Sequence, residues 1–305
     1  MPNIYPLQVE IDQKDIDKLV KVYVTAQKQI EKEILTATDF GVYNRRAILA
    51  QIEAILQNLA NETDDTIREV IPKYYKVGAT QANSQLRNIN APVDIEKDFN
   101  LIHQEAIAAL IDDTAKAFGE SLTGVSRSAN LLLGKATRDL ITQKMATGII
   151  GGKALREVRQ MIKGIMQEQG IAALKDKAGH TWTLDRYSEM LFRTKTVEAR
   201  NRGLANRMVE YDYDLVQVSA HSGCDMCRPY EGRILSLTGA TKGYPTLEEA
   251  EANGLFHPNC KHAINTLIPS LAKISNAYYP DEETKVIAKA EVEKAVKLEM
   301  PNLPK

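Results

Sequence analysis

Apolar residues recur at helical spacing along the first 170 residues of the chain. Between residues 12 and 38 they share one face and step by three, four or seven positions: Ile16, Leu19, Tyr23, Ile30 and Ile34. The same spacing predicts further helices over residues 44–61, 63–87, 95–110, 126–147 and 153–168. No alternation typical of strands separates them, so the pattern predicts a mainly α fold with an extended N-terminal helical region.

Two residues within the predicted helices need separate comment. Pro72 lies inside the 63–87 segment and predicts a bend or a break there. His103 follows Ile102, a member of the apolar face of the 95–110 segment. A lone histidine at the edge of such a face is usually a packing residue with satisfied ring nitrogens, so we expect no ligand role for His103.

The apolar surface of this helical region fits two arrangements. Its stripes can bury one another in a bundle, or they can be partner-binding faces of an elongated arm that docks on a larger assembly. The stripes from Ile16 to Leu59 suit both arrangements. The sequence leaves this choice open.

The pattern changes after Gly170, where short stretches replace the long helical ones. Residues 172–184 contain a turn at Gly179 and β-forming residues at Thr181-Trp-Thr183, which predicts a hairpin. A long helix is predicted over 185–210, strands over 215–220, 232–237 and 263–268, and a short helix over 247–252 that Thr246 caps and Gly254 ends. These elements predict a small C-terminal α+β unit.

The chain is therefore expected to have three regions: helical residues 1–170, an α+β unit over 171–268, and a linker with a charged helix over 269–305. Of its 305 residues, 44% are hydrophobic and 26% charged, as in globular proteins. The net charge of −1 gives no overall footprint for nucleic acid. We expect no membrane segment, because no stretch approaches ~20 apolar residues, and no signal peptide.

The helix predicted over 185–210 is rich in basic residues, namely Arg186, Arg193, Lys195, Arg200, Arg202 and Arg207. One interpretation is a solvated face balanced by Glu189, Glu198 and Glu210, since charge runs on helices usually lie at the surface. The other is a local basic stripe that faces DNA phosphates. Both interpretations stay open here.

The residues that carry chemistry gather in one C-terminal stretch, which holds all three cysteines and three of the five histidines. Cys224 and Cys227 form a Cys-x-x-Cys turn, and His257, Cys260 and His262 follow after a loop. Two thiolates on a tight turn, with a second His/Cys element, are typical of a tetrahedral zinc site. The three cysteines and either His257 or His262 would supply four ligands, and the other histidine would support the site or lie at the surface.

Two other interpretations of the cysteines remain, namely reduced thiols without a metal and a redox pair. A redox pair expects a thioredoxin-like βαβ pattern, which the surrounding sequence lacks. A disulfide would leave the third cysteine unpaired, which argues against a secreted disulfide framework and fits a reducing cytoplasm. We expect a structural zinc, because a small unit with few large apolar residues has a small core and needs a bound metal for stability.

Two segments of this stretch resemble a known family: Cys224-Asp-Met-Cys227-Arg-Pro-Tyr-Glu-Gly232 and Gly254-Leu-Phe-His257-Pro-Asn-Cys260-Lys-His262. They are similar to the C-terminal part of tailed-phage minor capsid proteins, which are head-morphogenesis proteins similar to the F protein of phage Mu. Within these, the resemblance is to the branch called phage minor capsid protein 2, and its motifs cover residues 182–268. The chain departs from the family at Lys261, for an arginine, and at His262, where many members have cysteine. The second departure keeps His262 as a candidate ligand.

This resemblance implies a virion protein, made in the bacterial host cytoplasm and incorporated into the head in few copies near the portal. It implies contact with the portal protein and with the major capsid or scaffold protein, and proximity to packaged DNA. The implied role is in head assembly or in genome packaging and ejection. On this view the helical region docks on the assembly, and the protein is not an enzyme.

Motifs of several enzyme classes are missing from the sequence, which has no Gly-x-Ser-x-Gly elbow and no His-Glu-x-x-His pair. The alternative from another class is an HNH-like nuclease of a phage or prophage, with a zinc-stapled fold. Its candidate catalytic residues are His257, Asn259 and His262. A toxin domain, which some relatives carry after this unit, needs more chain than residues 269–305 offer.

Overall fold

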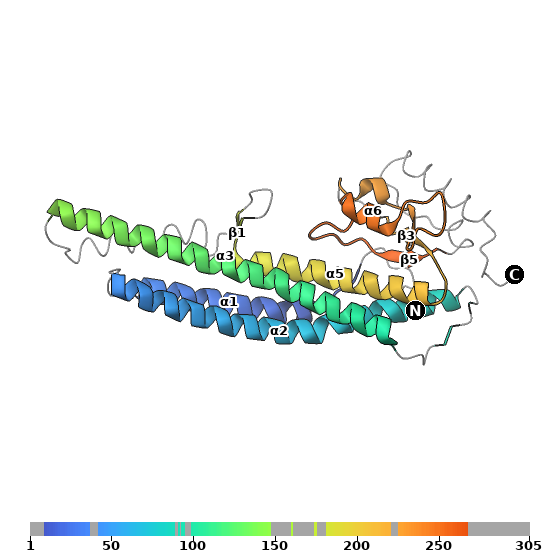
Figure 1. Ribbon diagram of the computed structural model, residues 1–305, viewed down its shortest axis with the longest axis horizontal. Helices are drawn as coiled ribbons and strands as arrows, with labels where there is room; N and C mark the ends of the chain where they lie inside the picture. The colour runs from blue at the N-terminus through green and yellow to red at the C-terminus, as the bar shows by residue number, and fades with distance from the viewer. Residues whose placement is uncertain are drawn as a thin grey trace. The chain divides into compact units, whose positions relative to one another are not determined.

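Figure 1 shows the computed structural model, which describes residues 9–36, 42–88, 91, 93, 94, 99–147, 160, 174, 175, 181–220 and 225–267. Its helices are α1 (Gln13–Leu35), α2 (Val42–Arg87), α3 (Leu101–Thr147), α5 (Leu184–Glu210), α6 (Leu247–Ala252) and the 3-10 helix η1 (Arg228–Tyr230). Its strands are β1 (Leu174–Lys175), β2 (Thr181–Trp182), β3 (Leu215–Val218), β4 (Ile234–Ser236) and β5 (Ile264–Thr266). The described chain is mainly helical, as predicted, and none of its helices is long and apolar enough to cross a membrane.

The chain divides into two compact units, whose borders fall inside α2, α3 and α5. We call residues 13–68 and 112–191 the helical unit, and the described residues of 9–12, 69–111 and 192–267 the sheet unit. The predicted boundaries at 170 and 268 lie outside the described residues, as do most of the predicted 153–168 helix and all of 269–305. These boundaries stay predictions.

In the helical unit, α1 runs alongside α2 and α3 (Figure 1). All five residues of the predicted α1 face are buried: Ile16, Leu19, Tyr23, Ile30 and Ile34. The ring of Tyr23 packs against Phe118 with centroids 5.9 Å apart, and its hydroxyl oxygen lies 3.3 Å from the hydroxyl oxygen of Thr63. The α1 stripe is therefore internal core of this unit, which favours a bundle over a free docking face for α1.

α2 is one continuous helix, so the predicted break before residue 63 is wrong, and Pro72 lies inside the helix. The hydroxyl of Thr63 donates to the carbonyl oxygen of Leu59 at 2.6 Å, so this polar residue joins the helix instead of capping a new one. A proline inside a helix costs about 3 kcal/mol. Its neighbours Ile71 and Tyr75 are fully buried, and burial of apolar side chains is a stabilising contribution that opposes this cost.

α3 joins segments that the sequence predicted as separate helices, and it begins at Leu101. The predicted apolar face is wrong at Ile102, whose side chain is 66% exposed. His103 faces inward instead, with Nδ1 2.7 Å from the Tyr75 hydroxyl and Nε2 3.0 Å from a Glu210 carboxylate oxygen. The expectation of a satisfied packing histidine is confirmed.

The sheet unit is built around three antiparallel strands in the order β4-β3-β5. Val216 of β3 pairs with Leu235 of β4 and with Thr266 of β5. The buried face of this sheet packs with Leu204 and Met208 of α5. All three predicted strands are present, although each is shorter than expected, and the predicted hairpin is present as antiparallel β1 and β2 of the helical unit.

α6 begins and ends where the sequence predicts. Thr246 is its N-cap and forms a capping box with Glu249, in which each side chain accepts a hydrogen bond from the other residue's backbone amide. Gly254 follows the helix with φ of 105°, a conformation that glycine adopts without a steric penalty. The chain then turns directly into the segment that holds the histidines and cysteines.

Two basic residues of α5 are buried in the sheet unit, so neither the solvated-face nor the DNA-stripe interpretation holds for them. Arg200 is 2% exposed, and its guanidinium donates to the carbonyl oxygen of Ile264 at 2.9 Å and to the side chains of Asn201 and Gln81. This burial lowers the pKa of Arg200 to about 9. Arg207 is 3% exposed and pairs with Glu210.

Candidate metal centre

Cys227 occupies the first half of the candidate site, directly before η1. The amide of Tyr230 donates to the carbonyl oxygen of Cys227 at 2.9 Å, and Pro229 lies in the first turn, where its missing N–H costs no hydrogen bond. The side chain of Cys227 is fully buried. The other residue of the predicted Cys-x-x-Cys turn, Cys224, lies outside the described residues.

A tight turn from His257 to Cys260 forms the second half, between α6 and β5. The amide of Cys260 donates to the carbonyl oxygen of His257 at 2.9 Å, and the amide of Asn259 donates to the hydroxyl of Thr194 on α5 at 3.1 Å. Phe256 and Asn259 have φ of 61° and 64°. A left-handed backbone costs about 1–3 kcal/mol at a bulky residue such as Phe256, so surrounding contacts hold this turn in a strained shape.

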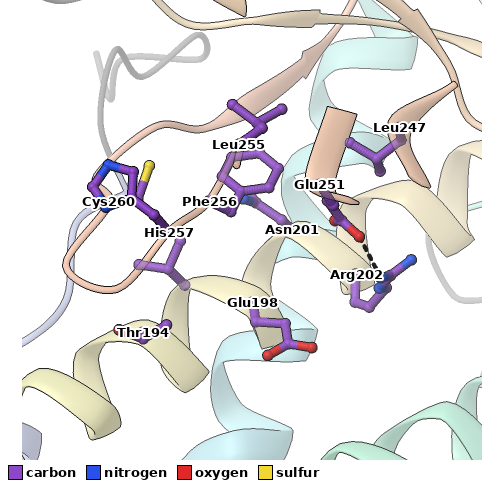
Figure 2. Close-up of a pocket in the computed structure, with 11 residues that line it drawn as sticks. Thr194, Glu198, Asn201, Arg202, Leu247, Glu251, Leu255, Phe256, His257 and Cys260 are labelled. Carbon is purple, nitrogen blue, oxygen red and sulfur yellow. Dashed lines mark hydrogen bonds and ion pairs between the residues drawn. The ribbon is translucent and has the colours of Figure 1, made fainter. Parts of the chain in front are cut away.

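The two halves bring three predicted ligands together. The sulfur atoms of Cys227 and Cys260 are 3.6 Å apart, and a ligand atom from each of Cys227, His257 and Cys260 lies within 4.8 Å of the others. Figure 2 shows His257 and Cys260 side by side at one end of a pocket. A disulfide requires a separation of about 2.0 Å, so these thiols are not joined. These three side chains lie close enough to hold a metal ion, and thiolate and imidazole are donors that zinc accepts.

His262 lies at the same two sulfurs. Its Nδ1 is 3.3 Å from Sγ of Cys260, and its Nε2 is 3.0 Å from a carboxylate oxygen of Glu231. Burial lowers the pKa of His262, but its hydrogen bonds with Cys227 and Glu231 outweigh this effect and raise the pKa above its ordinary value. Both candidate histidines are therefore close to the thiols, so the structure leaves two nitrogen donors for one predicted position.

The protonation of Cys227 matters for metal binding. Its hydrogen bond with Cys260 and its burial raise the pKa of Cys227 to about 12, against the opposing effect of His262. The sulfur is therefore a thiol at neutral pH when no cation is bound. A metal would have to displace this proton, so we expect metal binding to release protons and to weaken as the pH falls.

A pocket of about 220 Å³ adjoins this centre, between α5 and α6. Figure 2 shows Thr194, Glu198, Asn201 and Arg202 on the α5 side of the pocket. Arg202 pairs with Glu251 of α6 at 2.9 Å. Burial raises the pKa of Glu251, although Arg202 acts in the opposite direction.

Sequence reasoning missed two residues of the site, Glu231 and Thr194. Glu231 lies within the segment that resembles the family, but a carboxylate at this spacing belongs to no general metal motif. Thr194 lies on a distant helix, and only folding brings its hydroxyl to the turn at Asn259. Neither role follows from residue spacing, because each depends on a contact between elements far apart in the chain.

Comparison with known proteins identifies the family. Residues 15–297 match the family described as phage minor capsid protein 2. No curated protein and no solved structure matches the chain. The match extends beyond the motifs around Cys227 and Cys260 into the helices α1 to α3, and it supports a capsid-related role and a place in the virion. The chain belongs to the phage minor capsid protein 2 family.

Proposed function

We propose that this protein is a structural component of the phage head, present in few copies near the portal, where it aids head assembly or genome packaging and ejection. Family membership supports the capsid-related part of this role. The observation that carries the structural reading is the burial of Cys227, Cys260 and His262 in contact with one another. Side chains enclosed in this way suit a structural metal site better than a catalytic site, because a catalytic group has to reach its substrate.

The metal in this proposal is zinc. Its ligands are Cys224, Cys227, Cys260 and one of His257 or His262, and a site with four protein ligands contributes directly to folding. Such a zinc would join the turn before η1 to the turn before β5. The proposed partners are the portal protein, the major capsid or scaffold protein and packaged DNA, with the helical region as the docking part.

The alternative of an HNH-like nuclease gains little from the positions of its candidate residues. His262 is 1% exposed, and its ring lies between Cys260 and Glu231. A general base has to reach the water or the phosphate on which it acts. His257 and Asn259 are more accessible, but they lie in the turn that would supply zinc ligands under this proposal, and the backbone amide of Asn259 donates to Thr194 there.

Incorporation into procapsids tests the proposed role. The full chain would be co-expressed with the major capsid and scaffold proteins, with and without the portal protein, and its amount in purified procapsids measured by mass spectrometry. We expect incorporation only when the portal is present. A protein of low copy number has to bind at a vertex that differs from all the others, and the portal creates that vertex. Equal incorporation without the portal would contradict the proposed location. Absence from procapsids that contain the portal would contradict a structural role in the head.

A further inference from the structure

Glu231 and His262 form a buried pair beside the two sulfur atoms. Each side chain is 1% exposed, and Nε2 of His262 lies 3.0 Å from Oε1 of Glu231. Glu231 directly follows η1, on the Cys227 side of the site, whereas His262 follows Cys260. The pair therefore joins the two halves of the candidate metal centre.

The carboxylate decides which ring nitrogen of His262 carries the proton. A carboxylate only accepts hydrogen bonds, so Nε2 of His262 is the donor in this pair. In a neutral ring, Nδ1 then has no proton and offers its lone pair. This atom lies 3.3 Å from Sγ of Cys260, and that sulfur is 3.6 Å from Sγ of Cys227. The pair thus holds a nitrogen lone pair beside two sulfurs.

The backbone of His262 supports the same arrangement. Its amide N–H lies 3.4 Å from Sγ of Cys260 and donates to this sulfur. Hydrogen bonds to the charged form of a group favour that form, so this contact favours the thiolate that a metal needs. His262 therefore supports the site with both its ring and its main chain.

His257 is held in a different way. Its Nδ1 lies 2.7 Å from the carbonyl oxygen of Pro258, the next residue, and its side chain is only partly buried. A contact within one turn restrains the ring less than a buried pair that joins two segments of the chain. The carbonyl oxygen of Pro258 also only accepts, so the His257 ring is protonated at Nδ1. The two candidate histidines differ in burial, since the His262 side chain is 1% exposed and its partner Glu231 lies in the other half of the site.

We propose that Glu231 is a positioning residue of the metal centre, which makes Nδ1 of His262 the nitrogen ligand beside the sulfurs of Cys227 and Cys260. This inference rests on the proposed zinc site and decides between its two histidines. A ligating histidine often donates a hydrogen bond from its other ring nitrogen to a carboxylate, which fixes the orientation of the ring and raises its basicity. Removing such a carboxylate typically weakens metal binding about 10–100-fold.

Zinc affinity of the full chain is the first measurement, made by competition with a chromophoric chelator. Glu231→Ala should bind zinc about 10–100-fold more weakly than the wild type. Glu231→Gln should recover part of this loss, because its amide oxygen still accepts from Nε2. Glu248→Gln is the matched control, since Glu248 is an exposed carboxylate on α6, and it should bind as the wild type does. His262→Ala should weaken binding more than His257→Ala.

Histidine-selective 15N NMR of the zinc-loaded full chain is the second measurement, and a general loss of stability would not imitate its result. We expect the His262 signals of a ring protonated at Nε2 and coordinated through Nδ1, and loss of this pattern in Glu231→Ala. Coordination through Nε2, or wild-type affinity in Glu231→Ala, would overturn the positioning role and leave the zinc site intact. A wild-type chain that binds no zinc would overturn the metal centre itself, and the positioning role with it.

Discussion

A β-carbon added at Gly78 on α2 would lie 1.9 Å from the carbonyl oxygen of Arg200 on α5. The relationship is reciprocal, because a β-carbon at Gly203 on α5 would lie 2.0 Å from the carbonyl oxygen of Tyr75 on α2. Within the sheet unit the two helices therefore meet backbone to backbone. The same helix α5 carries Thr194, whose hydroxyl accepts a hydrogen bond from Asn259 in the turn with the candidate ligands.

Substituting either glycine should separate these helices. We expect Gly78→Ala and Gly203→Ala each to lower the free energy of unfolding by about 1–3 kcal/mol or more, because the obstructing atoms are backbone and cannot rotate away. Gly119→Ala is the matched control: Gly119 is also helical, yet nothing lies within 4 Å of an added β-carbon. That control should be neutral or stabilising by up to about 1 kcal/mol. Urea unfolding measures all three, and equal stability of Gly78→Ala and Gly119→Ala would contradict the packing.

Asp214 should make the sheet unit sensitive to acid. Burial alone would raise the pKa of Asp214, but hydrogen bonds from Thr238, Thr241 and Ser236 outweigh it and lower the pKa to about 2. An unfolded aspartate has a pKa of about 3.9, so the folded state favours the ionised form. This stabilisation is complete above that value and is lost as the pH falls towards 2.

Stability measured between pH 7 and pH 3 tests this prediction. Asp214→Asn should be less stable than the wild type at pH 7, by about 1–3 kcal/mol, and the difference should shrink as the pH falls. Asp212→Asn is the control, because Asp212 is exposed and its φ of 60° suits asparagine equally well. A constant difference across this range would show that the hydrogen bonds of Asp214 do not depend on its charge.

Chelation should affect the two units unequally. The described residues of the proposed centre lie in the sheet unit, whereas the α1 stripe is buried within the helical unit. We expect a chelator to abolish hydrogen-exchange protection in β3, β4 and β5 while protection in α1 persists. The reason is that metal binding stabilises the part of the chain that supplies the ligands. Cys260→Ser should show the same pattern without a chelator. Loss of α1 protection together with that of the strands would mean that the chain unfolds as one.

DNA hydrolysis separates the structural proposal from the nuclease. We expect the full chain to leave plasmid DNA intact with magnesium, manganese or zinc, because His262 is enclosed by Cys260 and Glu231. Supercoiled plasmid resolved on agarose measures nicking directly. Metal-dependent nicking that His257→Ala abolishes, with fold and zinc content retained, would favour the nuclease.

Local patterns in the sequence predicted the parts of the fold that depend on neighbouring residues. The α1 stripe, the capping of α6 by Thr246 and the glycine turn at Gly254 all follow from residues within a few positions of one another. The same reasoning divided α2 at residue 63, because the pattern does not show that the Thr63 hydroxyl bonds back to the helix. Local signals thus located elements well and their continuity poorly.

Contacts between distant segments were beyond the reach of sequence patterns. Arg200 belongs to a run of basic residues that is typical of a surface, yet it is buried because Gln81 and the carbonyl oxygen of Ile264 accept its hydrogen bonds. Spacing grouped Cys227, Cys260 and both histidines as candidate ligands, and the fold brings these side chains close together. Spacing could not reveal Glu231, because the partner of a histidine ring is set by the fold.

The zinc content of the full chain, purified without added metal, shows whether the site around Cys227 and Cys260 holds a structural metal. Elemental analysis should find about one zinc per wild-type chain, as a site with four protein ligands requires. A Cys227→Ser, Cys260→Ser double variant, purified in parallel, should retain less than about a tenth of this amount, because it lacks two thiolate ligands. A folded wild-type chain with as little zinc as the double variant would contradict the account.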